Sequence, residues 1–323
     1  MLPVSVHAGW YKTSFDAMGT VVEIELWAEL EASANGAFDE ARAEITRLEN
    51  LLSPYIETSE VSLINRAQSA ESVNVSEETF AIIRRALEFS RLSDGAFDIS
   101  FAAAGAYYDY RAQQQPDLTA LEQLKKSINF EKIVLTQDDE SQSVALAGSA
   151  MAIDLGGIAK GFTVDRVADI FRGLGIESAA LSIGGDSIFI GDRGPSMRAG
   201  GRLPWVVGIK HPRTAHGDQD VFAFRMPVND VAFSTSGDYE RYFINDAGER
   251  VHHILDPSSG LSADGVVSVS VLGPESLDCD ALSTSLFVLG VEEGIALIER
   301  IDDYEAILID STGKMHYSSG LAP

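Results

Sequence analysis

The stretch from Asp154 to Asp165 places an acid, two adjacent glycines and a lysine at the start of an expected helix. Its sequence is Asp-Leu-Gly-Gly-Ile-Ala-Lys-Gly-Phe-Thr-Val-Asp, and the helix is predicted over residues 158–172. Backbone N–H groups at a helix N-terminus attract anions, and glycines let a bulky anion come close. Lys160 adds a positive charge that can reach a phosphate oxygen. The stretch therefore indicates a phosphate-binding turn, and a glycine-rich turn with a solvated lysine is the alternative.

Two oxygen-bearing side chains, Asp280 and Thr284, are four residues apart in a helix predicted over residues 278–289. Residues with this spacing share one face of a helix. A carboxylate and a hydroxyl are hard ligands of the kind that Mg²⁺ uses, with waters and substrate phosphates completing its octahedron. The pair therefore suggests a magnesium site. The alternative is an acid at the helix start and a threonine bonded to the backbone.

The pair His252-His253 precedes the turn sequence Asp256-Pro257, so it is predicted to lie at the end of a strand beside a loop. Catalytic groups often lie in such loops, and histidine is a natural general base near neutral pH. Adjacent strand residues face opposite sides, so only one of the two can point into a given site. A hydrogen-bonded structural histidine is the alternative for either residue.

Several other catalytic signatures are absent from the sequence. There is no P-loop spacing G-x-x-x-x-G-K-[ST], no Gly-x-Ser-x-Gly elbow and no His-Glu-x-x-His pattern. The segment Thr235 to Tyr239 is loop-like and rich in small donors, but no sequence-level triad accompanies its serine. Gly173-Leu174-Gly175 ends a helix and lacks the third glycine of a dinucleotide-binding fingerprint.

The composition is that of a globular protein with a strongly acidic surface. Of 323 residues, 45% are hydrophobic, and 49 acids face 24 basic residues for a formal charge of −25. Such a surface repels nucleic acid and anionic membranes, so neither is an expected partner. An anionic ligand then needs a local positive site, such as Lys160 together with a metal ion. The only cysteine, Cys279, excludes an internal disulfide and a thiolate metal cluster.

Two sequence observations concern location. No apolar run reaches the roughly 18 residues that are needed to span a membrane, so no transmembrane segment is expected. Residues 1–11 lack a basic region followed by an apolar region, so no signal peptide is visible. Two expectations stay open: a cytoplasmic protein, or a periplasmic one, with or without a membrane anchor, whose leader was removed.

The elements that must position these residues are short strands interspersed with amphipathic helices. Strands are predicted over residues 20–28, 132–135, 143–146, 179–183, 187–190, 205–209, 221–226, 231–234, 239–244, 266–271 and 306–309. Helices are predicted over residues 38–52, 118–126, 158–172, 278–289 and 292–300, and another begins after the N-cap Ser76 and stops at Asp94-Gly95. The absence of a regular βαβ alternation favours an α+β fold. We expect one domain over residues 1–323, with a weak sub-lobe boundary near 191–201.

Many segments of the chain match one known family in order. They are Met18-Gly19-Thr20, Ser53-Pro54-Tyr55 with Ser59-Glu60 and Asn65, Gly95-Ala96-Phe97-Asp98, Asp154 to Asp165, Ser182-Ile183-Gly184-Gly185-Asp186, Thr235 to Arg241, His252 to Pro257 with Gly260, and Asp280 to Thr284 with Leu289-Gly290. With these segments the chain resembles the ApbE family, the FAD:protein FMN transferases, over nearly its whole length. Each match alone is weak, but their combination and order are highly specific.

The resemblance implies an α+β protein with mixed or antiparallel sheets and packed helices in two closely associated lobes. Members of the family bind FAD and, with Mg²⁺, move its FMN half onto a threonine or serine of an acceptor flavoprotein, releasing AMP. The implied flavin contacts are Met18, Tyr55, Ala96, Phe97, Asp98, Asp154, Lys160 and Ile254. The implied metal ligands are the backbone oxygen of Gly157 together with Asp280, Ser283 and Thr284. His253 matches the residue that is proposed in the family to activate the acceptor hydroxyl.

Two departures from the family pattern affect these expectations. Ser283 stands where many relatives have a small apolar residue, so either its side chain or its backbone oxygen is the ligand. The leader that is common in the family is not visible in this sequence. Two alternatives to the transferase stay open: an FAD pyrophosphatase that uses water to release FMN and AMP, and a non-catalytic FAD-binding protein.

Overall fold

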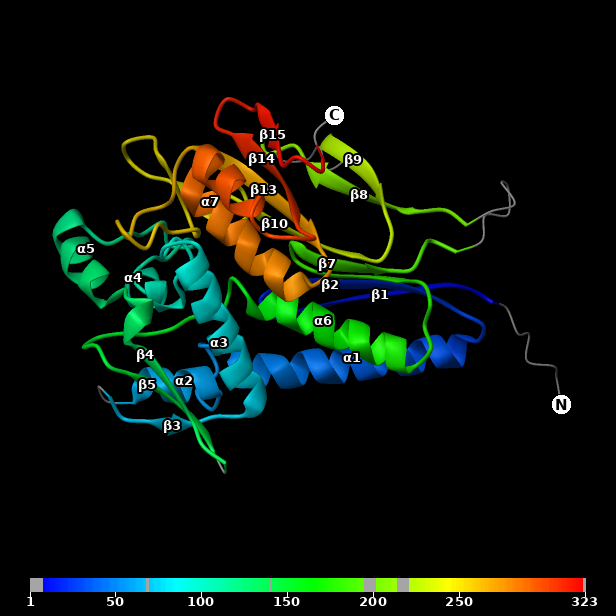
Figure 1. Ribbon diagram of the computed structural model, residues 1–323, viewed down its shortest axis with the longest axis horizontal. Coiled ribbons are helices and arrows are strands. Elements are labelled where there is room, and N and C mark those ends of the chain that lie inside the picture. The colour runs from blue at the N-terminus through cyan, green and yellow to red at the C-terminus, as the bar shows by residue number, and fades with distance from the viewer. Residues whose placement is uncertain (1–7, 68–69, 140, 195–201, 214–220, 322–323) are drawn as a thin grey trace. The chain divides into compact units, whose positions relative to one another are not determined.

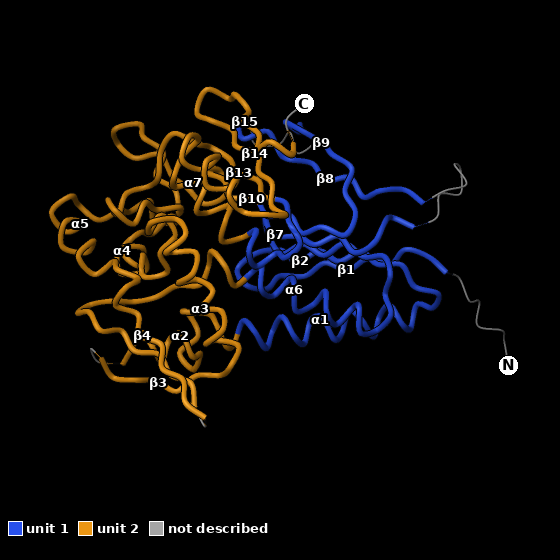
Figure 2. Tube along the Cα trace, viewed as in Figure 1, with its two compact units in different colours: residues 1–49, 160–234, 272–279 blue, residues 50–159, 235–271, 280–323 orange. Residues whose placement is uncertain are grey.

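The computed structural model describes residues 8–67, 70–139, 141–194, 202–213 and 221–321. The chain divides into two compact units, coloured separately in Figure 2. Unit 1 comprises Met1–Glu49, Lys160–Ser234 and Leu272–Cys279, and unit 2 comprises Asn50–Ala159, Thr235–Val271 and Asp280–Pro323. Both units are therefore assembled from segments that are far apart in the sequence. Most of the stretch expected to hold a sub-lobe boundary, residues 195–201, lies outside the described residues.

Unit 1 is built on antiparallel strands (Figure 1). Strands β1 (Gly9–Ala17) and β2 (Thr20–Ala28) form a hairpin whose turn residues, Met18 and Gly19, have φ angles of 51° and 70°. Positive φ at both turn residues matches the twist of a two-residue hairpin. The strand order is β1, β2, β6 (Ala179–Ile183), β7 (Asp186–Ile190) and β10 (Val231–Gly237), and β8 (Trp205–Lys210) pairs separately with β9 (Phe222–Val228).

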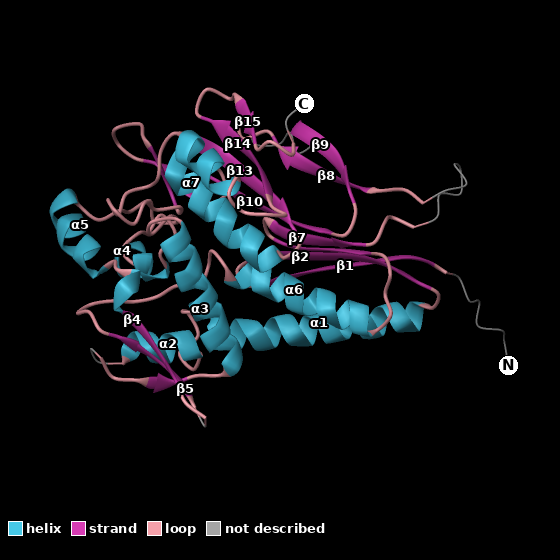
Figure 3. Ribbon diagram, viewed as in Figure 1, coloured by secondary structure: helices cyan, strands magenta, loops and turns pink. Residues whose placement is uncertain are grey.

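Two helices of unit 1, α1 (Glu31–Leu52) and α6 (Ala159–Gly173), lie on the same side of this sheet (Figure 3). Strand β2 alternates between apolar and acidic residues, so that one of its faces is buried and the other is not. The apolar face of β2 and the facing positions of the two helices form the core, which includes Val22, Ile24, Leu26, Ala41, Ile45, Leu48, Val164 and Phe171. Arg166 of α6 forms an ion pair with Glu44 of α1 at 3.6 Å, which joins the two helices at their surface.

Unit 2 contains the remaining strands and most of the helices. The second half of β10 is followed in its sheet by β13 (Val266–Gly273), β14 (Glu305–Asp310) and β15 (Met315–Tyr317). A small sheet has the strand order β3 (Val73–Asn74), β5 (Gln142–Leu146) and β4 (Ile133–Gln137). Strand β11 (Tyr242–Ile244) pairs with β12 (Arg250–His252). The helices are α2 (Glu60–Arg66), α3 (Glu77–Leu92), α4 (Ala102–Gly105), α5 (Leu118–Leu124) and α7 (Ser276–Ile298). The predicted α+β fold with antiparallel sheets is confirmed.

The ends of α3 agree with the sequence prediction. The Ser76 hydroxyl accepts the N–H of Thr79 at 3.3 Å, as an N-cap does. The helix ends at Leu92, and Asp94 and Gly95 follow with positive φ angles of 50° and 85°. This backbone reversal, which glycine adopts without strain, starts the Gly95–Asp98 loop that carries three of the implied flavin contacts.

Helix α7 is long and apolar enough to pass a length-and-composition test for a membrane span, with a mean hydropathy of 1.6. The expectation that the chain has no transmembrane segment is therefore not confirmed. Half of the apolar window is buried inside the protein, and buried core helices pass the same test. Gly290 also has non-helical dihedral angles (φ 78°, ψ −173°), so α7 consists of two helices joined at a kink.

The N-terminus of α7 is held by Asp165 from α6. The carboxylate of Asp165 accepts the N–H groups of Ser276 and Leu277 at 2.9 and 2.8 Å, which satisfies two backbone donors of the first turn. Gly161, one turn earlier on α6, allows close approach, because a Cβ there would lie 2.2 Å from the carbonyl oxygen of Ser276. Burial raises the pKa of Asp165 to about 7, against the opposing effect of these two hydrogen bonds.

We expect Asp165 to make the free energy of unfolding decrease as the pH rises from about 4 to about 7. In this range the folded protein keeps a proton on Asp165 that the unfolded chain, with a pKa near 3.9, has released. The slope from this group is at most roughly 1.4 kcal/mol per pH unit. In Asp165→Asn this part of the slope should vanish, which urea unfolding at a series of pH values measures. Asp169→Asn, an exposed acid on the same helix, is the control, and identical slopes in both variants would contradict the expectation.

Candidate functional site

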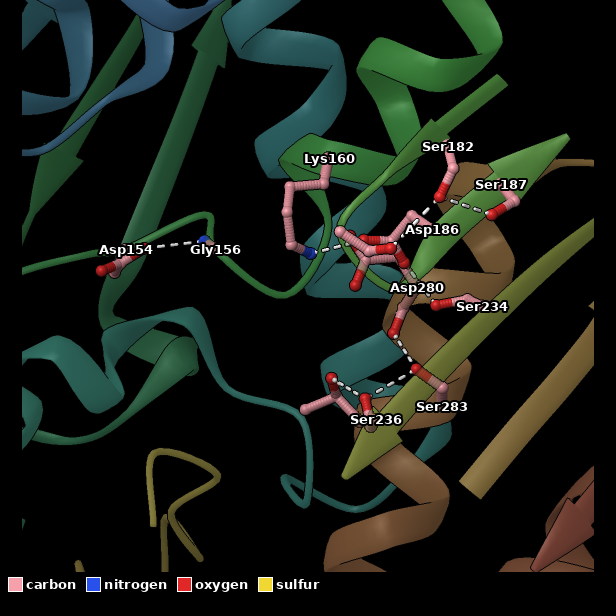
Figure 4. Close-up of polar contacts among 12 residues, drawn as sticks. Asp154, Gly156, Lys160, Ser182, Asp186, Ser187, Ser234, Ser236, Asp280 and Ser283 are labelled. Carbon is pink, nitrogen blue, oxygen red and sulfur yellow. Dashed lines mark hydrogen bonds and ion pairs between the residues drawn. The ribbon is translucent and has the colours of Figure 1, made fainter. Parts of the chain in front are cut away.

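Lys160, in the first turn of α6, is paired with a buried acid within unit 1. Its ammonium lies 2.6 Å from Oδ2 of Asp186, which begins β7 and is 2% exposed. The hydroxyl of Ser234 in β10 donates to the other carboxylate oxygen of Asp186 (Figure 4). Because its ammonium has a buried partner, Lys160 is not simply a solvated lysine. The network instead holds the positive charge at the helix N-terminus, where the sequence predicts an anion.

The turn that contains Asp154 is fixed from two sides within unit 2. The side-chain amide of Asn65 exchanges two hydrogen bonds with the backbone of Ile153, at 2.9 and 2.7 Å. The backbone N–H of Asp154 donates to the carbonyl of Ile99 at 2.9 Å, and its carboxylate accepts the N–H of Gly156 at 2.7 Å. These contacts place the turn beside the segment that follows the Gly95–Asp98 loop.

Gly157 lies where three implied site segments meet. A Cβ at this position would be 3.2 Å from the ring of Phe97 and 3.5 Å from the hydroxyl oxygen of Thr284. The Phe97 ring is itself buried and packs edge-on against Phe89, with ring centroids 6.3 Å apart. The loop before α6, the Phe97 loop and α7 are thus brought together in unit 2, and a side chain at Gly157 would press against the ring of Phe97.

A chain of hydroxyl groups connects α7 to the end of β10. The Ser236 hydroxyl lies 2.8 Å from the Ser283 hydroxyl and 3.3 Å from that of Thr284. The Ser283 hydroxyl donates to the carbonyl oxygen of Asp280 at 2.9 Å (Figure 4). Asp280 and Ser283 are 3% and 0% exposed, whereas Thr284 is half-buried. Of the Ser283 and Thr284 hydroxyls, that of Thr284 is therefore the more accessible one.

The donor chemistry of this group fits a hard cation. Among the residues that the structure describes, no group of three or more His, Cys, Asp or Glu side chains could hold a metal ion. A site at α7 would instead combine a carboxylate, hydroxyls and a backbone carbonyl oxygen. Such all-oxygen sets suit Mg²⁺, which is bound through one or two carboxylates and keeps positions for water and phosphate. The proximity of Gly157 to the Thr284 hydroxyl is compatible with that set.

The carboxylate of Asp98 holds its own loop. It accepts the N–H and the hydroxyl of Ser100 at 2.8 and 2.6 Å and the N–H of Phe130 at 2.9 Å. Burial raises the pKa of Asp98, which these hydrogen bonds oppose. Its neighbour Ala96 is half-buried. A flavin contact from this loop therefore has a rigid base.

The two histidines have different environments, as the sequence predicts for adjacent strand residues. His252 is 4% exposed, its Nε2 lies 2.9 Å from the carbonyl oxygen of Ala263, and its ring packs edge-on against Phe287. His253 is half-buried and comes directly after β12. Its backbone N–H donates to the backbone carbonyl of Arg241 at 3.2 Å. His252 is thus a structural residue of the core, and His253 is the more accessible of the two.

The hairpin that ends at His252 is anchored by a small hydrophobic cluster, consisting of Tyr108, Phe243, Val251 and Leu255. The hydroxyl of Tyr108 donates to the carbonyl of Gly260 at 2.8 Å, and burial raises the pKa of Tyr108 to about 12. Ile254, an implied flavin contact, is 6% exposed. The cluster fixes both ends of the segment that carries His253.

Two further implied flavin contacts lie at the surface of their units. Tyr55, in unit 2, is 85% exposed, so its ring is available to stack on a ligand. Met18, in unit 1, is half-buried, and its N–H donates to Glu49 at 2.9 Å. An open surface depression of about 550 Å³ beside it is lined by Asp16, Ala17, Gly19, Thr20, Val21 and Glu49.

The structure brings together part of the predicted set and adds residues that were not in it. Phe97, Gly157, Asp280, Ser283 and Thr284 gather in unit 2, while Met18 and Lys160 belong to unit 1. The added residues are Asn65, Asp165, Asp186, Ser234 and Ser236. All but Ser234 lie in segments that match the family, so their segments were visible in the sequence although their contacts were not.

Comparison with known proteins gives a consistent result. The model of the ApbE family matches residues 18–308. A Treponema pallidum protein named FAD:protein FMN transferase is 32% identical, with 94% of this chain and 85% of the relative covered. A Klebsiella pneumoniae protein of the same name is also 32% identical, with 96% of this chain and 92% of the relative covered.

Solved structures agree with these relatives. The crystal structure of the ApbE protein from Thermotoga maritima has a TM-score of 0.84 at 31% identity, covering 97% of this chain and 98% of that one. The flavin transferase ApbE from Vibrio cholerae has a TM-score of 0.80 at 28% identity with the same coverage. The family match spans most of the chain, and the fold agrees over nearly all of it. This chain belongs to the ApbE family.

Proposed function

We propose that this protein transfers the FMN half of FAD to a threonine or serine hydroxyl of an acceptor flavoprotein, in a reaction that depends on Mg²⁺ and releases AMP. Relatives over 94% and 96% of the chain carry the name FAD:protein FMN transferase. The observation that carries the proposal is the meeting of the glycine turn with Thr284 at Gly157. A phosphate-binding turn and hard oxygen ligands at one point are what a pyrophosphate substrate needs.

In this proposal, FAD is bound through both of its halves. Lys160 at the N-terminus of α6 attracts the pyrophosphate, and Asp186 fixes the direction of the ammonium. The exposed ring of Tyr55 gives the flavin or the adenine a stacking surface. The remaining flavin contacts are Met18, Ala96, Phe97, Asp98, Asp154 and Ile254. Because the protein carries a net charge of −25, local positive charge is a requirement for binding this anion.

The transfer step is a displacement at phosphorus. The acceptor oxygen forms a bond to the phosphorus of the FMN half, and the bond from that phosphorus to the bridging oxygen of the pyrophosphate breaks. The bridging oxygen leaves with its electron pair as part of AMP. His253 takes the proton of the acceptor hydroxyl, so charge and atoms balance. The product is a phosphodiester between riboflavin and the acceptor side chain.

The proposed Mg²⁺ ligands are Asp280, Ser283, Thr284 and the backbone oxygen of Gly157. When bound, the cation would neutralise charge on the phosphate oxygens during phosphoryl transfer. The protein's own contribution is position: α7 sets the spacing of Asp280 and Thr284, and the Asp165 contact fixes the start of that helix.

The test is incubation of the full chain with FAD, Mg²⁺ and a candidate acceptor flavoprotein, followed by mass spectrometry of the acceptor. An added FMN mass on a threonine or serine, with AMP released in equal amount, supports the transferase. Free FMN and AMP with unmodified acceptor would instead identify an FAD pyrophosphatase. Intact FAD after incubation with several acceptors would favour a non-catalytic flavin-binding protein.

We expect the protein to bind FAD more tightly than FMN or riboflavin, because Lys160 and the metal site recognise the pyrophosphate. Lys160→Ala should weaken FAD binding by roughly 10–100-fold, the loss of one hydrogen bond to a charged group, and should leave riboflavin binding nearly unchanged. Flavin fluorescence titration measures both constants. Lys12→Ala removes an equal charge from an exposed lysine that is paired with Glu25, and it is the control. Equal affinity of the unmodified protein for FAD and riboflavin would contradict this expectation.

A further inference from the structure

Ser236 contacts both hydroxyl groups of the proposed metal site but is not one of the proposed ligands. It lies in β10, is half-buried, and approaches Ser283 at 2.8 Å and Thr284 at 3.3 Å. Its neighbour on the same strand, Thr235, instead pairs with the Ser270 hydroxyl at 2.8 Å. Adjacent strand residues face opposite sides, so Ser236 alone of the two is directed at α7.

The directions of these hydrogen bonds follow from counting protons. A hydroxyl has one proton to donate and two lone pairs to accept with. Ser283 donates its proton to the carbonyl oxygen of Asp280, which cannot donate. The distance of 2.8 Å between the Ser236 and Ser283 oxygens allows either to donate, and with the proton of Ser283 in use we assign this contact to the proton of Ser236. The distance of 3.3 Å between the Ser236 and Thr284 oxygens allows either to donate, and with the proton of Ser236 in use we assign this contact to the proton of Thr284.

This order has a consequence for the two hydroxyl oxygens of α7. In this order of bonds the proton of Thr284 is directed at Ser236, which leaves the lone pairs of the half-buried Thr284 hydroxyl for a ligand. A hydroxyl that binds a cation needs this orientation, with its proton directed away from the ion. Ser283, in contrast, is fully buried, and its oxygen accepts from Ser236 while its proton is used on the helix backbone.

Resting on the function proposed above, we propose that Ser236 is a positioning residue that orients the Thr284 hydroxyl for the metal ion, so that Thr284, and not Ser283, supplies the side-chain hydroxyl ligand. Partners behind a metal ligand commonly change metal affinity by about 10–100-fold when removed. The effect is transmitted through one hydrogen bond and requires no contact between Ser236 and the ion.

The experiment measures Mg²⁺ binding to the full chain by calorimetry, with Mg²⁺ alone and at saturating FAD, and without any acceptor. We expect Ser236→Ala to weaken Mg²⁺ binding by roughly tenfold or more. Ser236→Thr, which keeps the hydroxyl, should restore most of the affinity. Thr235→Val, which removes the neighbouring hydroxyl on the other face of the strand, should leave it unchanged. Ser283→Ala should have a smaller effect than Ser236→Ala.

Thermal unfolding separates positioning from a structural role. Without Mg²⁺, Ser236→Ala should melt close to the unmodified protein, and only the stabilisation by added Mg²⁺ should be reduced. The inference would be overturned if Ser283→Ala lost more Mg²⁺ affinity than Ser236→Ala, or if the unmodified chain did not bind Mg²⁺. Because the measurement uses no acceptor, it remains valid even if the protein does not transfer flavin. A Ser236→Ala variant with normal Mg²⁺ affinity would contradict the inference about Ser236 but not the proposed transfer reaction.

Discussion

Replacing His253 with alanine is expected to slow flavin transfer by about 10²–10⁴-fold while FAD still binds, because a general base contributes about this much to a proton transfer. His253 is half-buried, comes directly after β12 and is more exposed than His252. The rate of the unmodified protein should also fall with decreasing pH, because a protonated imidazole cannot accept a proton. Single-turnover rates at saturating FAD and acceptor measure both effects.

The matched control for this prediction is His252. Its ring packs against Phe287 and bonds Ala263, so alanine there would reduce stability as well as activity. His252→Gln keeps a donor near the Nε2 position and is the better comparison, with a smaller catalytic loss expected. If His253→Ala lost only flavin affinity, His253 would be a positioning residue. Asp238, a buried acid 3.8 Å from Arg250, would then be the first candidate for the base.

Asp280→Asn is expected to abolish Mg²⁺-dependent turnover while the fold stays intact. Asp280 is the only charged member of the proposed ligand set, and Mg²⁺ binding by proteins relies on carboxylates. The loss should exceed the roughly 10–100-fold that is typical of residues behind the ligands. Initial rates across an Mg²⁺ titration, with circular dichroism to confirm folding, measure it.

Asp278→Asn is the control for Asp280→Asn. Asp278 is also buried, at 4% exposure, and lies two residues earlier on the same helix, so it points in a different direction. The same change of charge is then made beside the proposed site but outside its ligand set. A folded Asp280→Asn variant with the Mg²⁺ dependence of the unmodified protein would place the metal elsewhere.

The sequence alone predicted most elements that have strong periodicity. The alternation in β2, the helical spacing in α1 and the N-cap of α3 act within a few residues, so local propensity and patterning suffice to find them. Strand β1 was not predicted, although its half-buried residues Tyr11, Thr13, Phe15 and Ala17 alternate with the exposed Lys12, Ser14 and Asp16. Helix α2 and strands β3 and β15 have seven residues or fewer, too few to establish a period. The three-residue strand β12 was predicted only through the turn that follows the His252-His253 pair.

The candidate site likewise contains residues that the sequence predicts and contacts that it does not predict. The residues of the Asp154–Lys160 turn and of the Asp280–Thr284 pair are close in the chain, so the sequence alone was enough to predict a phosphate site and a metal site there. Their partners are distant: Asp186 is 26 residues from Lys160, Ser236 is 47 from Ser283, and Asp165 is 111 from Ser276. Local propensity does not specify such pairs, because they depend on which strands and helices pack together. Only the tertiary structure could therefore decide that Lys160 is held by a buried acid and that a serine of β10 meets the hydroxyls of α7.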